Sequence, residues 1–166
     1  MANIEIESIG KLEPHPENPE EWLISEPVPI KFFDGKMLKF SFDENSFDDE
    51  DFLSAANQAI KNFLAKNTDD KLNLSTPVYK EYRIIQDWYD ALPDGAKPLE
   101  INNKSGIWNL VYPTEINVCS GGNEDKNIYL LIYSECEWEP EHGLQLVFKN
   151  GLELTRVSGI DCSPIE

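Results

Sequence analysis

The stretch that decides the fold runs from Tyr129 to Val157 and reads YLLIYSECEWEPEHGLQLVFKNGLELTRV. The run of residues 128–133, which overlaps the start of this stretch, is apolar at every position. Such a run is typical of a central strand covered on both faces. Beyond it, apolar and acidic residues alternate with the two-residue period of a strand, so one parity belongs to the core and the other to the opposite face. The core parity holds Cys136 and Trp138, and the other holds Glu135, Glu137 and Glu139.

The dipeptide Asn150-Gly151 is the strongest turn signal in the chain. Between two apolar strands, Asn-Gly favours a two-residue type I′ turn, because both positions must adopt a positive φ angle. Such a turn would place Lys149 opposite Leu152, and therefore Gln145 opposite Arg156.

The turn before that hairpin is expected over residues 139–143, with Trp138 opposite Leu144. This register keeps Leu144, Leu146 and Phe148 on the core face. It also predicts a row of three side chains across one sheet face: Glu137, Gln145 and Arg156. Glu141 and His142 would lie at the adjacent turn, and Glu135 would lie in the next row.

The remaining elements follow from local patterns. Residues 1–21 predict an N-terminal strand followed by an acidic, proline-rich arm, and Asp34-Gly35 predicts a hairpin turn. A helix is expected after the acidic run 43–51, and a second one from Ser75 to a stop at Pro93. Residues 107–158 predict antiparallel hairpins. Together these elements predict one α+β domain over residues 1–166, with a mostly antiparallel sheet of about six strands and two helices packed on one face.

Composition limits the classes of function. The chain has 166 residues with 31 acids against 14 bases, a formal charge of −17, and 40% hydrophobic residues. The hydrophobic content is enough to fold without disulfides or metal. The charge repels nucleic acid and anionic lipid and attracts a basic protein or a cation. The acidic segments 13–26 and 43–51 concentrate this charge. For residues 43–51, helix capping with solubility and partner or cation binding both stay open.

The sequence has no recognisable export signal, which predicts a location in the cytoplasm. Glu5 and Glu7 lie where a secretory leader would need positive and then apolar residues. No apolar run approaches the roughly 20 residues that span a bilayer. The three cysteines are odd in number and widely spaced, as expected of reduced thiols. We therefore predict a cytoplasmic protein with no membrane partner.

The predicted polar row has three alternative interpretations. It can be a surface ion pair worth roughly 0 to 1 kcal/mol, or a binding surface, or part of a hydrolase in which Glu137, Glu141 and His142 act as acid and base. The hydrolase interpretation lacks a nucleophile motif, since the sequence contains no Gly-x-Ser-x-Gly. Cys136 lies on the core face, away from the glutamates, so neither a metal nor another cofactor is predicted. The candidate binding residues are Glu135, Glu137, Glu141, His142, Gln145 and Arg156, and no catalytic residue is assigned.

The segment IYLLIYSECEWEPEHGLQLVFKNGLELTRVSGIDC resembles the C-terminal signature of an uncharacterised bacterial family, the DUF6985 domain. In that signature a strand ends in Cys-x-Trp-Glu-x-Glu-His-Gly and leads into a strand and a glycine-containing turn. The matching positions are Trp138, Glu139, Glu141, His142, Gly143 and Gly151. The resemblance extends to the strand with FFDGK and the helix ending AIKNFL. The signature continues with Asp-Gly-His, whereas this chain has Asp161, Cys162 and Ser163, which weakens an enzymatic or metal role.

The resemblance implies no established activity. Related small acidic bacterial domains are often suspected to be immunity proteins that neutralise toxins, and the resemblance implies this role only by analogy. An anionic surface can steer association with a basic toxin. The first hypothesis is therefore a non-enzymatic, cytosolic protein-binding domain of immunity type with a basic protein partner. The alternative is a small hydrolase using a Glu/His site near the 139–143 turn.

Overall fold

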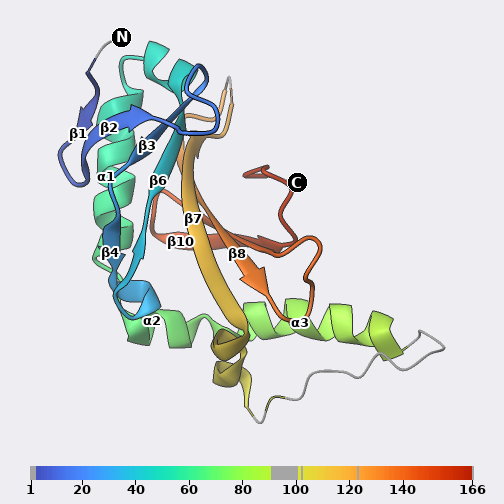
Figure 1. The fold of residues 1–166 in the computed structure, drawn as a ribbon. Coiled ribbons are helices and arrows are strands. Elements are labelled where there is room, and N and C mark those ends of the chain that lie inside the picture. The colour runs from blue at the N-terminus through green and yellow to red at the C-terminus, as the bar shows by residue number, and fades with distance from the viewer. Residues whose placement is uncertain (1–2, 91–100, 102, 123, 166) are drawn as a thin grey trace.

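A computed structural model describes residues 3–90, 101, 103–122 and 124–165 (Figure 1). Its main feature is an eight-stranded sheet with strand order β1-β2-β3-β6-β7-β8-β9-β10, beside a two-stranded sheet of β4 and β5. The strands are β1 (Glu5–Ile6), β2 (Gly10–Pro14), β3 (Trp22–Ser25), β4 (Val28–Ile30), β5 (Lys36–Leu38), β6 (Phe40–Asp43), β7 (Val111–Ser120), β8 (Ile128–Cys136), β9 (Leu144–Lys149) and β10 (Glu153–Ser158).

The helices of the described residues are α1 (Phe52–Leu64), α2 (Thr68–Asn73) and α3 (Ser75–Asp90), with 3-10 segments η1 (Lys31–Phe33), η2 (Glu44–Asp48) and η3 (Lys104–Leu110). The two predicted helices are α1 and α3. Helix α2 was not predicted, because it is short and apolar periodicity is weak over so few residues; its start is a capping box of Asn67 and Asp70. The predicted stop at Pro93 lies outside the described residues. No helix of the described segments is both long and apolar enough to cross a bilayer.

The mixed fold with a mostly antiparallel sheet is confirmed, but the predicted number of strands was too low. Residues 1–21 contain two paired strands, β1 and β2, where one strand and an arm were expected. Strands β7 to β10 form an antiparallel meander, whereas β6 and β7 pair in parallel. The chain between β6 and β7 carries all three α-helices, which is the long crossover that a parallel pair requires.

In the region 107–158, where antiparallel hairpins were predicted, the first four residues do not belong to a strand. Residues 104–110 form the 3-10 segment η3, and β7 begins at Val111 and continues past Pro113. The pairing of β7 with β8 shifts between Pro113 and Glu115, which is consistent with a bulge where proline supplies no N–H to the ladder.

One face of the sheet forms the main core, which α1 covers by contacting β7 and β8 (Figure 1). The predicted core residues are all buried there: Cys136, Trp138, Leu144, Leu146 and Phe148. The ring of Phe148 lies 5.6 Å from that of Phe32 and 5.1 Å from that of Phe63, measured between centroids. The core therefore joins the meander to α1 and to η1.

The opposite face carries a second, smaller apolar cluster of Tyr129, Leu131 and Val147. Gln145 belongs to the same parity of β9 and is fully buried. Its side chain bonds to residues 161–163, so the C-terminal segment covers this face, on the side of the strands away from α1 (Figure 1).

The predicted register of the hairpins was wrong. Leu144 lies opposite Ser134 rather than Trp138, because the turn between β8 and β9 is longer than expected. On the other side of β9, Lys149 lies opposite Glu153, and a bulge at Thr155 places Arg156 opposite Val147 rather than Gln145. Asn150 and Gly151 do adopt the predicted positive φ angles of 54° and 71°.

Candidate functional site

The predicted row of Glu137, Gln145 and Arg156 is not formed. Gln145 lies opposite Tyr133 on β8, and Glu137 lies beyond the end of that strand. The N–H of Glu137 donates to the Leu110 carbonyl at 3.1 Å, and its Oε1 accepts a 3.3 Å bond from the Tyr112 hydroxyl. The Glu137 charge raises the pKa of that phenol. Glu135 lies opposite Tyr112, with its side chain exposed.

Gln145 and Arg156 nevertheless meet, through a carboxylate that was not among the predicted site residues. Gln145 Nε2 donates to Asp161 Oδ1 at 3.1 Å, and Arg156 Nη1 donates to the same oxygen at 2.9 Å. Arg156 Nη2 bonds to the other oxygen, Oδ2, which makes the pair bidentate. Both side chains also donate to the Ser163 carbonyl, at 3.0 and 2.8 Å. The network therefore holds the C-terminal segment on the sheet.

The Arg156 guanidinium lowers the pKa of Asp161 from 3.8 to about 2. A carboxyl whose pKa is lower in the folded state contributes stability that is present above its unfolded pKa and is lost as the pH falls through the folded value. We expect Asp161→Asn to lower the free energy of unfolding by about 1 kcal/mol at neutral pH, because solvent screens this partly exposed side chain. The difference from the unsubstituted protein should shrink between about pH 4 and pH 2.

Urea denaturation across that pH range measures the effect. Glu153→Gln is the matched control, since Glu153 is exposed on the same strand as Arg156. A gap between Asp161→Asn and the unsubstituted protein that stays constant down to pH 2 would show that the ion pair contributes nothing.

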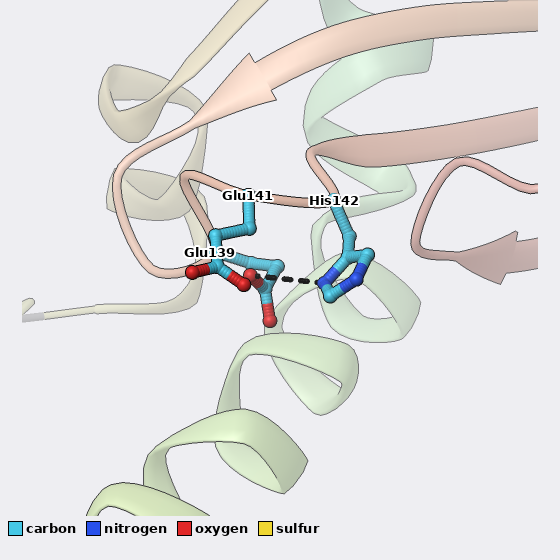
Figure 2. A group of neighbouring side chains, drawn as sticks. All are labelled: Glu139, Glu141 and His142. Atoms are coloured by element: carbon cyan, nitrogen blue, oxygen red, sulfur yellow. Dashed lines mark ion pairs between the residues drawn. The ribbon is translucent and has the colours of Figure 1, made fainter.

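The turn between β8 and β9 brings Glu139, Glu141 and His142 together (Figure 2). One ligand atom from each residue lies within 4.8 Å of the others, and His142 Nδ1 is 3.3 Å from Glu139 Oε1. The turn is closed by a 2.9 Å bond from the Gly143 N–H to the Glu139 carbonyl. Two carboxylates and an imidazole are a donor set suited to a divalent cation. The His142 side chain is 67% exposed, so this set lies at the surface.

The ribbon of this turn lies over a helix in Figure 2. Residues of the turn and of α3 line a cavity of about 220 Å³. Glu139 and His142 line it from the turn, and Glu81 and Trp88 line it from α3. Burial raises the pKa of the Glu81 carboxyl, and the Arg156 charge opposes that rise. The carboxylate paired with His142 is Glu139, which was not among the predicted site residues. Its spacing of three residues from His142 was a sequence signal that could have identified it.

A larger cavity of about 400 Å³ opens on the face away from α1. Residues from six parts of the fold line it: the β2–β3 loop, the strands β3, β6, β7 and β8, and the C-terminal segment. These residues are His15, Glu17, Asn18, Trp22, Ser41, Glu115, Asn117, Tyr133 and Cys162. None of them was selected as a site residue, because their proximity depends on strand order.

Hydrogen bonds hold the polar wall of this cavity in place. Asn117 Nδ2 donates to Ser41 Oγ at 3.2 Å, and Ser41 Oγ donates to Glu115 Oε2 at 3.0 Å. The other oxygen of Glu115, Oε1, lies 3.9 Å from His15 Nε2. The Glu17 N–H donates to His15 Nδ1 at 3.1 Å, so a neutral His15 carries its proton on Nε2, facing Glu115. The carboxylate therefore has one oxygen bound within the wall and one beyond hydrogen-bonding distance of His15.

The other walls are aromatic. Trp22 and Tyr133 are both half-buried. Burial, and after it a hydrogen bond with Cys162, raises the pKa of Tyr133, so its phenol is neutral at physiological pH. The Cys162 N–H donates to Gln145 Oε1 at 3.1 Å, which links the rim of the cavity to the Asp161 network.

The two acidic segments of the sequence meet at this end of the molecule. Trp22 pairs with Asp43, and the Glu44 N–H donates to the Glu21 carbonyl at 2.9 Å. Lys126, from the β7–β8 loop, lies 3.0 Å from Asp49. We call the resulting surface the acidic end; its carboxylates are Glu17, Glu20, Glu21, Asp43, Glu44, Asp48, Asp49, Glu50 and Asp51. It adjoins the 400 Å³ cavity, since Glu17 belongs to both and Trp22, which lines the cavity, pairs with Asp43.

Comparisons with known proteins give one result. A search of the curated proteins found no match, and a search of the solved structures found none. The profile of one family, described as a domain of unknown function (DUF6985), matches residues 8–164. That match takes in the turn with Glu139, Glu141 and His142, the acidic end and the whole meander. The chain therefore belongs to the DUF6985 family.

Proposed function

We propose that this protein is a non-enzymatic, cytoplasmic binding domain that captures a basic protein through its acidic end. The observation that carries the proposal is the meeting of the segments 13–26 and 43–51, which are separate in the sequence and joined by the pairing of β3 with β6. Carboxylates from both segments thus face a partner as one surface.

Electrostatics supports this role. Residues 43–51 contain no base, and the formal charge of the chain is −17. The Asp51 N–H and the Lys126 ammonium lower the pKa of Asp49, which keeps its charge as the pH falls. A surface of one sign raises the rate of association with an oppositely charged partner, and salt screens the attraction. Fast association of this kind would suit an immunity protein, which must capture a basic toxin and neutralise it.

The test compares two variants that each remove four negative charges. An oligoarginine peptide serves as the probe, and fluorescence anisotropy measures its affinity at low and high ionic strength. The acidic-end variant is E20Q/E21Q/D48N/E50Q. The control variant, with its changes elsewhere, is E5Q/D69N/D87N/E153Q. All eight side chains are exposed.

We expect the acidic-end variant to bind about tenfold more weakly at low salt, since a change at rim charges acts mainly on encounter. The control variant should bind within about twofold of the unsubstituted protein, because its substitutions lie outside the acidic end and salt screens distant charges. Equal weakening of the two variants would show that net charge alone attracts the peptide and would remove the proposal.

The alternative is a small hydrolase at the 139–143 turn. The observation that favours it is the 3.3 Å contact between His142 Nδ1 and Glu139 Oε1, a carboxylate–imidazole pair beside a cavity. In this alternative Glu139 takes the part assigned from the sequence to Glu137. It fails if His142→Ala leaves the hydrolysis of every screened ester and peptide unchanged.

A further inference from the structure

We propose that the 400 Å³ cavity beside the acidic end is an anchor pocket for one arginine side chain of the basic partner. This inference rests on the proposed function, and it adds where and by what chemistry the partner is held. The cavity volume lies in the range of about 300 to 1,000 Å³ typical of ligand pockets. It therefore has room for a guanidinium group together with part of its alkyl chain.

The charged contact comes from Glu115. Its Oε2 accepts the Ser41 hydroxyl, which Asn117 fixes in turn, so the carboxylate does not need to reorganise when a ligand enters. Its Oε1 lies 3.9 Å from His15, beyond hydrogen-bonding distance, and is available to a donor. Ser41 and Asn117 are 2% and 6% exposed, which makes this a built wall and not a mobile surface charge.

The aromatic walls add the second part of the recognition. A guanidinium is planar and weakly hydrated, so it stacks on aromatic rings as well as donating to carboxylates. Trp22 and Tyr133 line the cavity with Glu115, and Glu17 adds a carboxylate at the rim. A lysine ammonium is compact and strongly hydrated, and it would use this combination less well. The pocket should therefore prefer arginine to lysine.

The surroundings favour a protein side chain over a small free ligand. The cavity shares Glu17 with the acidic end, and its Trp22 pairs with Asp43 of that surface. A partner whose arginine enters the cavity therefore places its other basic residues against the carboxylates of the acidic end. Anchors of this kind, a few buried side chains within a charged rim, contribute a large share of the binding energy in protein interfaces.

The experiment titrates the full chain with arginine amide, lysine amide and oligoarginine. NMR shifts of the backbone N–H groups report binding of the two small ligands, and fluorescence anisotropy reports binding of the peptide. The pocket variant is Glu115→Gln, which keeps the shape of the side chain and an acceptor for Ser41. The matched control is Glu153→Gln, which removes the same charge from an exposed site outside the cavity. Thermal melts of both variants verify that they fold.

We expect arginine amide to shift the amides of Ser41, Asn117 and Cys162, and lysine amide to shift them less. Glu115→Gln should abolish these shifts and weaken oligoarginine binding about tenfold, whereas Glu153→Gln should leave both unchanged. Oligoarginine should bind much more tightly than the amide. If the amide binds as tightly as the peptide, the pocket serves a small free guanidinium compound, and the anchor is rejected.

Failure of this inference is separable from failure of the proposed function. If Glu115→Gln binds the peptide normally while the acidic-end variant does not, the anchor pocket is rejected and the acidic end stands. If Glu115→Gln loses affinity while the acidic-end variant retains it, the pocket stands and the wider surface is rejected. If neither variant loses affinity, both proposals are rejected.

Discussion

Gly151→Ala is expected to lower the free energy of unfolding by about 3 to 5 kcal/mol. A Cβ atom at this position would lie 1.9 Å from the Ala59 carbonyl oxygen and 3.1 Å from the Phe63 backbone nitrogen. Both are backbone atoms of α1, so neither can move aside without shifting the helix or the turn. The φ angle of +71° adds strain for any residue with a side chain.

Gly35→Ala is the matched control for that prediction. Gly35 has a φ angle of +87°, but a Cβ atom there would meet nothing within 4 Å. The control therefore measures the cost of the positive φ angle alone, about 1 kcal/mol. Urea denaturation of both variants gives the comparison. Equal losses in the two variants would mean that the close approach of the β9–β10 turn to α1 has no energetic importance.

Phe148→Ala is expected to cost about 3 to 5 kcal/mol, the usual loss for a buried aromatic residue cut back to alanine. Phe148 is fully buried, and its ring meets those of Phe32 and Phe63, which come from η1 and α1. The substitution would leave a cavity where three parts of the fold join, and such packed neighbours relax only partly.

Leu152→Ala is the control for this second prediction, because Leu152 lies close by in the chain but is 58% exposed. It should change stability by no more than about 0.5 kcal/mol. Chemical denaturation of both variants tests the contrast. A loss of less than about 1.5 kcal/mol for Phe148→Ala would show that the core collapses readily around this ring and is not organised by it.

The sheet faces were predictable, but the register was not. Trp138 was expected opposite Leu144, and Ser134 stands there instead, a slip of four residues along β8. Arg156 was expected opposite Gln145 and lies opposite Val147, a slip of two. The first slip is even, so the side chains of β8 and β9 keep their predicted faces while their neighbours change. Before the bulge, β10 is shifted by one residue, which places Leu154 opposite Phe148 on the core face. The bulge adds a second shift, after which Arg156 is again on its predicted face. Alternation is a local property of each strand, whereas register depends on the loops and on bulges such as that at Thr155.

The candidate site divides in the same way. Glu141 and His142 were selected because they share a turn, and the structure adds Glu139 from that turn. Gln145 and Arg156 were selected as a cross-strand pair, and Asp161 connects them instead. No local pattern could have selected Asp161, because the C-terminal segment has no periodicity and its position depends on the sheet that it covers.

The sequence by itself determined the apolar central strand, the division of its neighbours into a core face and an opposite face, the positive φ angles of Asn150 and Gly151, and the strong negative charge. These are properties of single residues and of short-range periodicity. The tertiary structure alone decided the register of the meander, the junction of the two acidic segments and the cavity around Glu115. Each of these needs residues far apart in the chain to meet, and strand order and loop length, which no local pattern encodes, control whether they do.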